Sequence, residues 1–203
     1  MLEIVGYGDM KTQDELEFVD QRSMIIIPQD DYSNWGKIIS ALNKNLFLVE
    51  IKTLLIPQIA ADATCQIVDL DPRESSLYSS GVSLMAVFNG PDGFEKTQSV
   101  AKNHGIICTK SDAQTRELYA LLCEGPNSRN IADTATLDNC TCGLVKPHAV
   151  KSRNTGDILD HVISQGYEVS AIASLYFNTV QASEFYEVRL IFLIDSSIVG
   201  LFD

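Results

Sequence analysis

The chain has 203 residues, of which 45% are hydrophobic and 21% are charged, a balance typical of a soluble globular protein with one large domain or two small ones. Its net charge of −12 argues against binding to nucleic acid or to an anionic membrane surface, because both need clustered Lys and Arg. No apolar run approaches the roughly 20 residues of a membrane span, and the first residues lack a signal-peptide pattern, so we expect an intracellular protein.

The first predicted elements alternate between strand and helix. Residues 23–27 form a short apolar run that ends at Pro28, which predicts a fully buried strand. After a loop over 29–35, apolar residues recur at helical spacing over 36–44, and 46–55 is rich in β-forming residues. This part of the chain therefore predicts a strand, a helix and a second strand.

The middle of the chain continues with mixed elements. We predict helices over 57–68, 94–103 and 111–122 and a strand over 81–88. Residues 69–80 and the polar stretch from 123 to 139 have the composition of loops. The five cysteines lack the paired spacing of a zinc site, and we expect packing residues or idle thiols at Cys65, Cys108, Cys123, Cys140 and Cys142.

The last part of the chain again reads as strand, loop, helix and strand. A predicted buried strand begins at Thr141 and ends at Lys146, an amphipathic run covers 157–165, and 167–176 is β-rich. A cation at a strand end, ahead of a helix start, suits a phosphate site. The alternative is a lysine that merely ends a strand.

An internal repeat links the two strand-helix-strand segments. A shift of 120 residues places Gly36 on Gly156 and Phe47 on Tyr167, and Pro28 falls on Lys146 if the second loop is two residues longer. The second copy then stops early, and its apolar residues 190–194 and 198–202 must be buried somewhere. One possibility is that the chain is an incomplete variant whose second copy cannot close its own sheet, and residues 190–202 would then have to supply a substitute strand or dock on a partner.

The segments Lys146-Pro-His-Ala-Val150 and Glu184-Phe-Tyr-Glu-Val188, with 156–160 and 163–170 between them, resemble nucleoside diphosphate kinases. The match is to the second repeat of the tandem-repeat, ciliary branch of that family, and residues 23–128 resemble the first repeat more weakly. The resemblance implies an α/β (α+β) ferredoxin-like fold with an antiparallel sheet and helices on one face, in two tandem copies, the second incomplete. It divides the chain into a remnant of a preceding domain with a connector (1–22), a degenerate domain (23–128), a linker (129–139) and a partial second domain (140–203).

The same resemblance implies a site that passes phosphate through a phosphohistidine, with cations around the phosphate. In the first copy Pro28 stands at the family lysine, and Glu124 stands at the family histidine, so no catalytic residue is expected. In the second copy Lys146 and Tyr186 match the lysine and the tyrosine of the nucleotide-phosphate site, and no histidine follows. We expect no cofactor and no metal, although the family implies ATP with magnesium.

The degenerate positions favour a non-catalytic structural protein of the ciliary or flagellar axoneme that binds doublet microtubules from inside. The resemblance implies tubulin, neighbouring axonemal proteins and the γ-tubulin complex as partners, in the cytoplasm and cytoskeleton. The alternative is a nucleoside diphosphate kinase or a nucleotide-binding pseudo-kinase.

Overall fold

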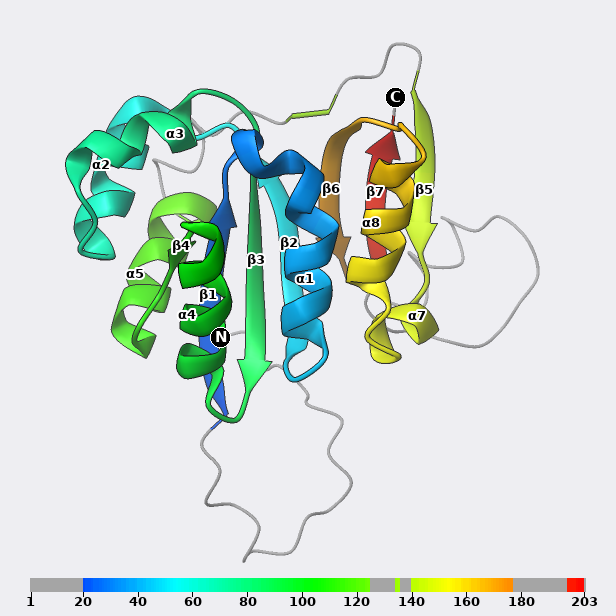
Figure 1. Cartoon of the computed structure of the whole chain (residues 1–203), viewed down its shortest axis with the longest axis horizontal. Coiled ribbons are helices and arrows are strands. Elements are labelled where there is room, and N and C mark those ends of the chain that lie inside the picture. Colours follow the sequence, from blue (N-terminus) through cyan, green and yellow to red (C-terminus); the bar gives the residue numbers. More distant parts are fainter. Residues whose placement is uncertain (1–19, 125–133, 136–139, 177–196, 203) are drawn as a thin grey trace, which may run out of the picture.

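The computed structural model describes residues 20–124, 134–135, 140–176 and 197–202. Its strands form one antiparallel sheet in the order β4-β1-β3-β2-β6-β7-β5 (Figure 1). The strands are β1 (Gln21–Ile27), β2 (Phe47–Leu54), β3 (Ser83–Gly90), β4 (Ile107–Cys108), β5 (Thr141–Val145), β6 (Val169–Leu175) and β7 (Ser197–Phe202).

Helices connect these strands in both halves of the chain. They are η2 (Gln29–Asn34), α1 (Trp35–Asn43), α2 (Gln58–Ile67), η3 (Pro72–Glu74), α3 (Ser75–Ser79), α4 (Gly93–His104), α5 (Asp112–Cys123), α7 (Pro147–Lys151) and α8 (Thr155–Ser164). We call the elements from β1 to α5 the first copy and those from β5 to β7 the second copy. The stretch 69–80, expected to be a loop, holds two short helices, since Asp71 caps η3 by accepting from the Arg73 amide.

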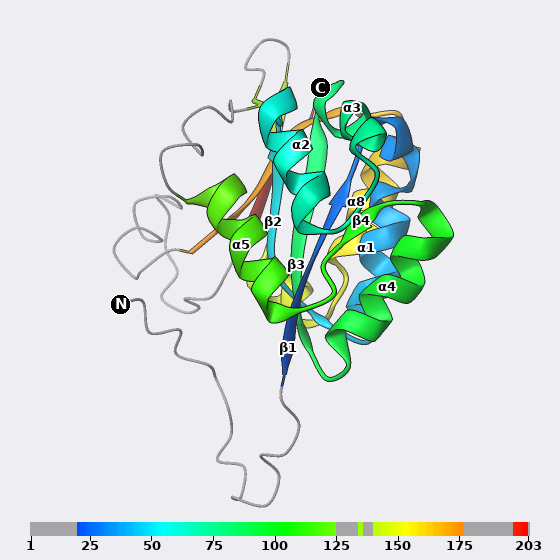
Figure 2. The ribbon, with the colours of Figure 1, turned by 90° about the vertical axis from the view of Figure 1, so that its left-hand side faces the viewer.

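Strand β1 lies inside the sheet and is buried from Ser23 to Ile27. Its side chains alternate between two cores: Ile25 and Ile27 face one, and Met24 and Ile26 face the other. Helices α1 and α4 cover the first face and α2 and α5 cover the second (Figure 2). The ferredoxin-like antiparallel fold is confirmed, but the expectation of helices on one face is wrong, because a strand of consecutive apolar residues needs cover on both sides.

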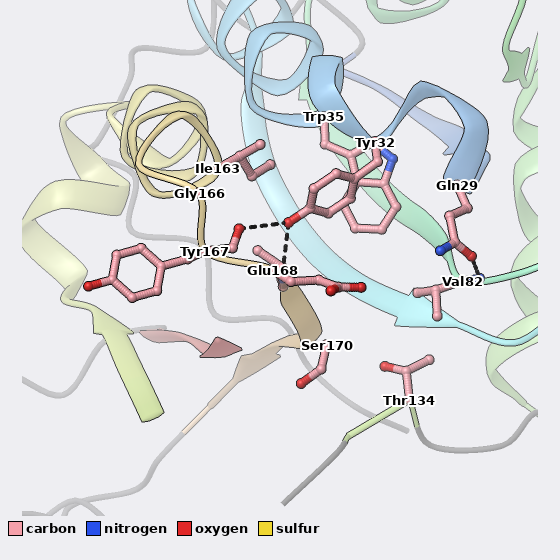
Figure 3. A pocket seen from close by; sticks show the side chains of 11 residues that line it. Gln29, Tyr32, Trp35, Val82, Thr134, Ile163, Gly166, Tyr167, Glu168 and Ser170 are labelled. Carbon is pink, nitrogen blue, oxygen red and sulfur yellow. Dashed lines mark hydrogen bonds between the residues drawn. The ribbon is translucent and has the colours of Figure 1, made fainter. Parts of the chain in front are cut away.

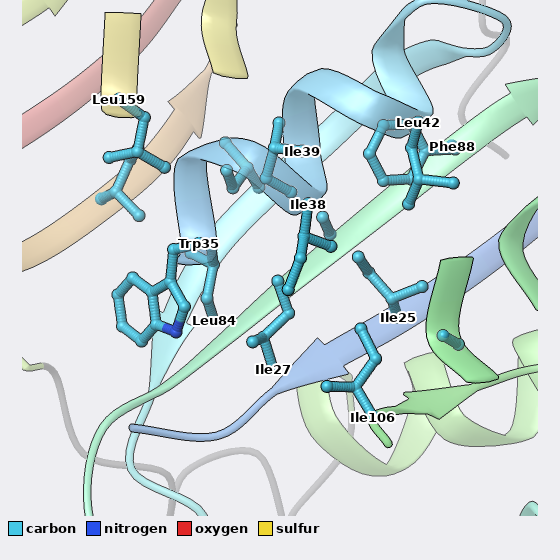
Figure 4. Close-up of a cluster of buried hydrophobic side chains, with 14 of the residues drawn as sticks. Ile25, Ile27, Trp35, Ile38, Ile39, Leu42, Leu84, Phe88, Ile106 and Leu159 are labelled. Carbon is cyan, nitrogen blue, oxygen red and sulfur yellow. The ribbon is translucent and has the colours of Figure 1, made fainter. Parts of the chain in front are cut away.

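The core under α1 contains Trp35, the largest fully buried side chain among the described residues. Trp35, Ile38 and Leu42 point from α1 onto the sheet, and Leu159 of α8 joins them from the second copy (Figure 4). Trp35 is only 1% exposed. The apolar face that the helical spacing predicted is therefore the face that holds α1 on the sheet.

The second copy uses residues 197–202 to complete its own sheet. Strand β7 lies between β6 and β5, so the order β6-β7-β5 repeats the order β2-β3-β1 of the first copy. The prediction of a substitute strand is thus confirmed for 197–202, whereas 190–194 lies outside the described residues. Strand β5 was expected to be buried and is instead exposed or half-buried, because among the described strands only β7 pairs with it.

The two copies meet at β2 and β6 and at α1 and α8. Lys52 pairs with Ala173 across the strands. Gly36 lies directly against the backbone of Asp160, and Gly156 lies against the backbone of Ser40. The shift of 120 residues turns Gly36 into Gly156 and Ser40 into Asp160, so the two contacts are equivalent. Paired equivalent contacts of this kind are typical of a two-fold symmetric interface between subunits. Here both halves of that interface are in one chain, and the residue limits of the domains stay a prediction.

Candidate functional site

In the first copy, the end of β1 carries no cation where the family lysine is expected. The Pro28 carbonyl accepts hydrogen bonds from Trp35 Nε1 and from the Asp31 amide, each at 3.2 Å. Three residues further on, the Asp31 carboxylate places its Oδ2 3.7 Å from His104 Nδ1. This end of the strand is therefore closed by a tryptophan and flanked by a carboxylate.

Glu124, at the expected histidine position, directly follows α5. Its side chain is exposed and its amide donates to the Ala120 carbonyl at 3.3 Å. Beside it, Leu121 lines a shallow cavity of about 410 Å³ between α2 and α5, together with Ala63, Gln66, Ile67 and Glu117. None of these side chains is basic, and two carboxylates would repel phosphate, so this region lacks the donors that phosphoryl transfer requires.

Lys146 is exposed and stands just before α7, and its carbonyl accepts from the amides of Ala149 and Val150. The start of α8, which was expected to lie open beside it, is covered by α1: Gly156 packs on Ser40, and Ser40 Oγ donates to Asp157 Oδ1 at 2.5 Å. A phosphate therefore has no room at that helix end. Tyr186 lies outside the described residues, so the pairing of Lys146 with Tyr186 stays a prediction.

A residue that sequence reasoning missed, Arg153, holds the loop before α8 against the first copy. Its Nη1 donates to the Lys44 carbonyl at 2.8 Å, and its guanidinium lies 4.2 Å from the centre of the Phe47 ring. Lys44 follows α1, so the cation also sits where the helix dipole is negative. Arg153, a cation in the loop before α8, is thus engaged in contact between the copies.

We call the contact between the two copies, at β2 with β6 and α1 with α8, the joint. On the side of the joint opposite Arg153 lies a cavity of about 660 Å³, called the joint cavity below. Its lining comes from η2, the start of α1, the residue before β3, the end of α8, the α8–β6 turn, the start of β6 and Thr134. The residues are Gln29, Tyr32, Trp35, Val82, Thr134, Ile163, Gly166, Tyr167, Glu168, Val169 and Ser170 (Figure 3). The Tyr32 hydroxyl donates to the Tyr167 carbonyl and accepts from the Val169 amide. No sequence pattern indicated this cavity, because its walls lie far apart along the chain.

In the described part of the chain, no three His, Cys, Asp or Glu residues gather closely enough to bind a metal ion. Likewise, none of the described helices has both the length and the apolar character of a membrane span. Burial raises the pKa of Cys65 and Cys108, and it raises the pKa of Cys123 to about 12, so these thiols stay protonated and unreactive near neutral pH.

Comparison of the sequence with known proteins points to one family. The family model described as nucleoside diphosphate kinase matches residues 139–190. Proteins of rat and mouse named nucleoside diphosphate kinase homolog 7 are each 27% identical to the chain over 226 positions, which cover 92% of it. The chain is a divergent nucleoside diphosphate kinase-like protein. It spans 54% of the length of each of these relatives.

The nucleoside diphosphate kinase-like match falls mainly on the second copy, where the sequence motifs are. The first copy lies outside the family-model match, although its strands and helices are the more complete set. The first copy therefore keeps the fold, and the assignment of Pro28 and Glu124 to the family's lysine and histidine positions stays a prediction.

Proposed function

We propose that this chain is a non-catalytic structural protein of the ciliary or flagellar axoneme that binds the inner surface of doublet microtubules. The non-catalytic part rests on Pro28 and Glu124, which the resemblance places at the family's lysine and histidine positions in the first copy. A carboxylate there cannot form a phosphohistidine, and it repels the phosphates that the lysine would attract.

The joint between the copies supports an assembly role. The sheet runs without interruption through both copies, and α1 packs on α8 with glycine at each contact. A rigid, paired unit of this kind presents a fixed surface, which suits a scaffold. The net charge of −12 matches tubulin poorly, since tubulin is also acidic, so the contacts must be local and shape-driven.

The axonemal location, with tubulin, neighbouring axonemal proteins and the γ-tubulin complex as partners, comes from the resemblance to the tandem-repeat, ciliary branch of the family. It is tested by expressing the tagged chain in ciliated cells and extracting isolated axonemes with increasing salt. We expect the protein to stay with the doublets at high salt, because exposed ionic contacts are screened while buried shape-driven contacts persist. A protein found entirely in the soluble fraction at low salt would refute the proposed location.

The alternative, a nucleotide-binding or active kinase, is favoured by exposed Lys146 at the end of β5. Two assays with the purified chain separate it from the proposal. Transfer of labelled phosphate from ATP to GDP in the presence of magnesium should stay at background. If nucleotide binds without transfer, Lys146→Ala should weaken that binding, whereas Lys37→Ala, at another exposed lysine, should not. Appreciable transfer would overturn the non-catalytic reading.

A further inference from the structure

The joint cavity has the chemistry of a cation site. Its lining contains one carboxylate, the two aliphatic hydroxyls of Thr134 and Ser170, and three aromatic side chains, and none of its lining residues is Lys, Arg or His. The Glu168 side chain reaches from the α8–β6 turn into the space below Tyr32 and Trp35, with Ser170 and Thr134 across from the rings (Figure 3). At about 660 Å³, the space exceeds what a single side chain fills.

The electrostatics around Tyr32 agree with this placement of Glu168. Burial raises the pKa of the Tyr32 hydroxyl, and the negative charge of Glu168 raises it further, against the opposing effect of the Val169 amide. Tyr32 and Trp35 meet edge to face with ring centres 5.0 Å apart, and their polar atoms are already bonded to backbone. The rings therefore offer an incoming group their aromatic surface and no free hydrogen-bond donor, which suits a planar cation.

One hydroxyl in the wall also lacks a bond. Ser170 Oγ is buried and has no hydrogen-bond partner among the described residues. A buried hydroxyl without a partner costs stability, so an occupant that donates to it gains binding energy. Gln29 does not supply that donor from within the wall, since its Oε1 is turned to the Val82 amide.

The internal two-fold provides a comparison within the same molecule. On the opposite side of the joint, Arg153 crosses from one copy to the other and fills its place with a guanidinium. The residue 120 positions earlier is Ser33, which is too short to cross. The joint therefore has a cation on one side and, on the other, a cavity with a carboxylate and no basic residue in its lining.

We propose that the joint cavity binds the guanidinium of an arginine presented by an extended segment of a partner protein. The guanidinium pairs with the Glu168 carboxylate, lies along Tyr32 and donates to the hydroxyls of Ser170 and Thr134, while the flanking peptide backbone fills the remaining space. Pro28, Glu124 and Lys146 are not among the residues that line this site, and the proposal does not depend on the proposed axonemal location.

The test uses the purified chain and the fluorescence of Trp35, which lines the cavity and is the single tryptophan of the sequence. The probe is the tripeptide acetyl-Gly-Arg-Gly-amide, and its matched control carries citrulline, which has the same shape and no charge. We expect a saturable change with the arginine peptide and at least tenfold weaker binding of the citrulline peptide. Methylguanidinium, the bare cation, should bind more weakly than the arginine peptide.

Two variants locate the binding site. Glu168→Gln should weaken arginine-peptide binding at least tenfold, and because Glu168 is exposed the fold should be kept. Glu117→Gln removes the same charge from the cavity between α2 and α5 and should leave binding unchanged. Equal weakening by both variants, equal binding of the citrulline peptide, or no saturable change would each overturn the proposal. Methylguanidinium that bound as tightly as the peptide would overturn the partner-protein part.

Discussion

Adding one methyl group to Gly156 should destabilise the protein, although the same change stabilises most helices. Gly→Ala inside a helix usually raises the free energy of unfolding by roughly 0.5–1 kcal/mol. Here the new methyl would overlap the Ser40 amide nitrogen and Cα and the Ile39 carbonyl carbon. These are backbone atoms of α1, which cannot rotate away, so α8 and α1 must separate.

The magnitude follows from the two opposing effects. Overpacking costs about 1–3 kcal/mol, and contact with rigid backbone places the cost near the upper end. After subtracting the helix preference, we expect Gly156→Ala to lower the free energy of unfolding by about 2 kcal/mol, or the melting temperature by about 4–8 °C for a chain of this length. Urea unfolding followed by circular dichroism measures the first quantity.

Two further variants check the reasoning. Gly36→Ala should cost a similar amount, because Gly36 meets the backbone of Asp160 in the reciprocal contact. Lys37→Ala, at an exposed neighbouring position, should change the free energy of unfolding by less than about 0.5 kcal/mol. A Gly156→Ala protein that is more stable than the parent would refute the close packing of α1 on α8.

Three other predictions concern the joint, the buried thiols and the added strand. Arg153→Ala should lower the free energy of unfolding by about 1–2 kcal/mol, because it removes a charged hydrogen bond and a cation–π contact. Arg73 pairs only locally at the surface, so Arg73→Ala should leave the free energy of unfolding nearly unchanged. Equal effects of the two variants would contradict the role of Arg153. Burial raises the Cys123 pKa to about 12, so the folded state holds a proton that the unfolded chain releases near pH 9. The free energy of unfolding should therefore fall as pH rises from about 9 to 12, and Cys123→Ala should reduce the slope of that fall. An unchanged slope would argue against burial of the thiol. Amides of residues 197–202 should exchange slowly with deuterium, because β7 pairs on both sides; fast exchange throughout β7 would contradict its place in the sheet.

Local elements were predictable where the sequence pattern is long and regular. The apolar run before Pro28 gave β1, and the spacing of residues 36–44 gave α1 to within one residue at each end. The shift of 120 residues also anticipated a real relation, since α1 and α8 begin at positions 35 and 155. Strand β4 was missed because two residues carry no periodicity and its pairing with β1 is tertiary.

Features of the candidate sites were harder to predict, because they arise from contacts between distant residues. The charge pattern at 146–156 suggested an open phosphate loop, yet the contact of Gly156 with Ser40 closes the helix start. Nothing near Glu168 in the sequence indicated a cavity, because the opposite wall begins at Gln29. Gly36 and Gly156, at matching positions of the two repeats, were the sequence signal available for the joint. By themselves they indicated that a helix is repeated and did not indicate that the two helices contact each other.

The position of β7 in the sheet sets an order of events during synthesis. Thr141 at the start of β5 pairs with Phe202, so the hydrogen bonds that β5 makes in the described sheet wait until residues 197–202 have left the ribosome. The first copy, whose strands pair within residues 21–108, folds without that delay. Contacts of such long sequence separation form slowly. The nascent second copy therefore passes through a stage with β5 unpaired, in which strand β6 already has the edge of β2 available as a template.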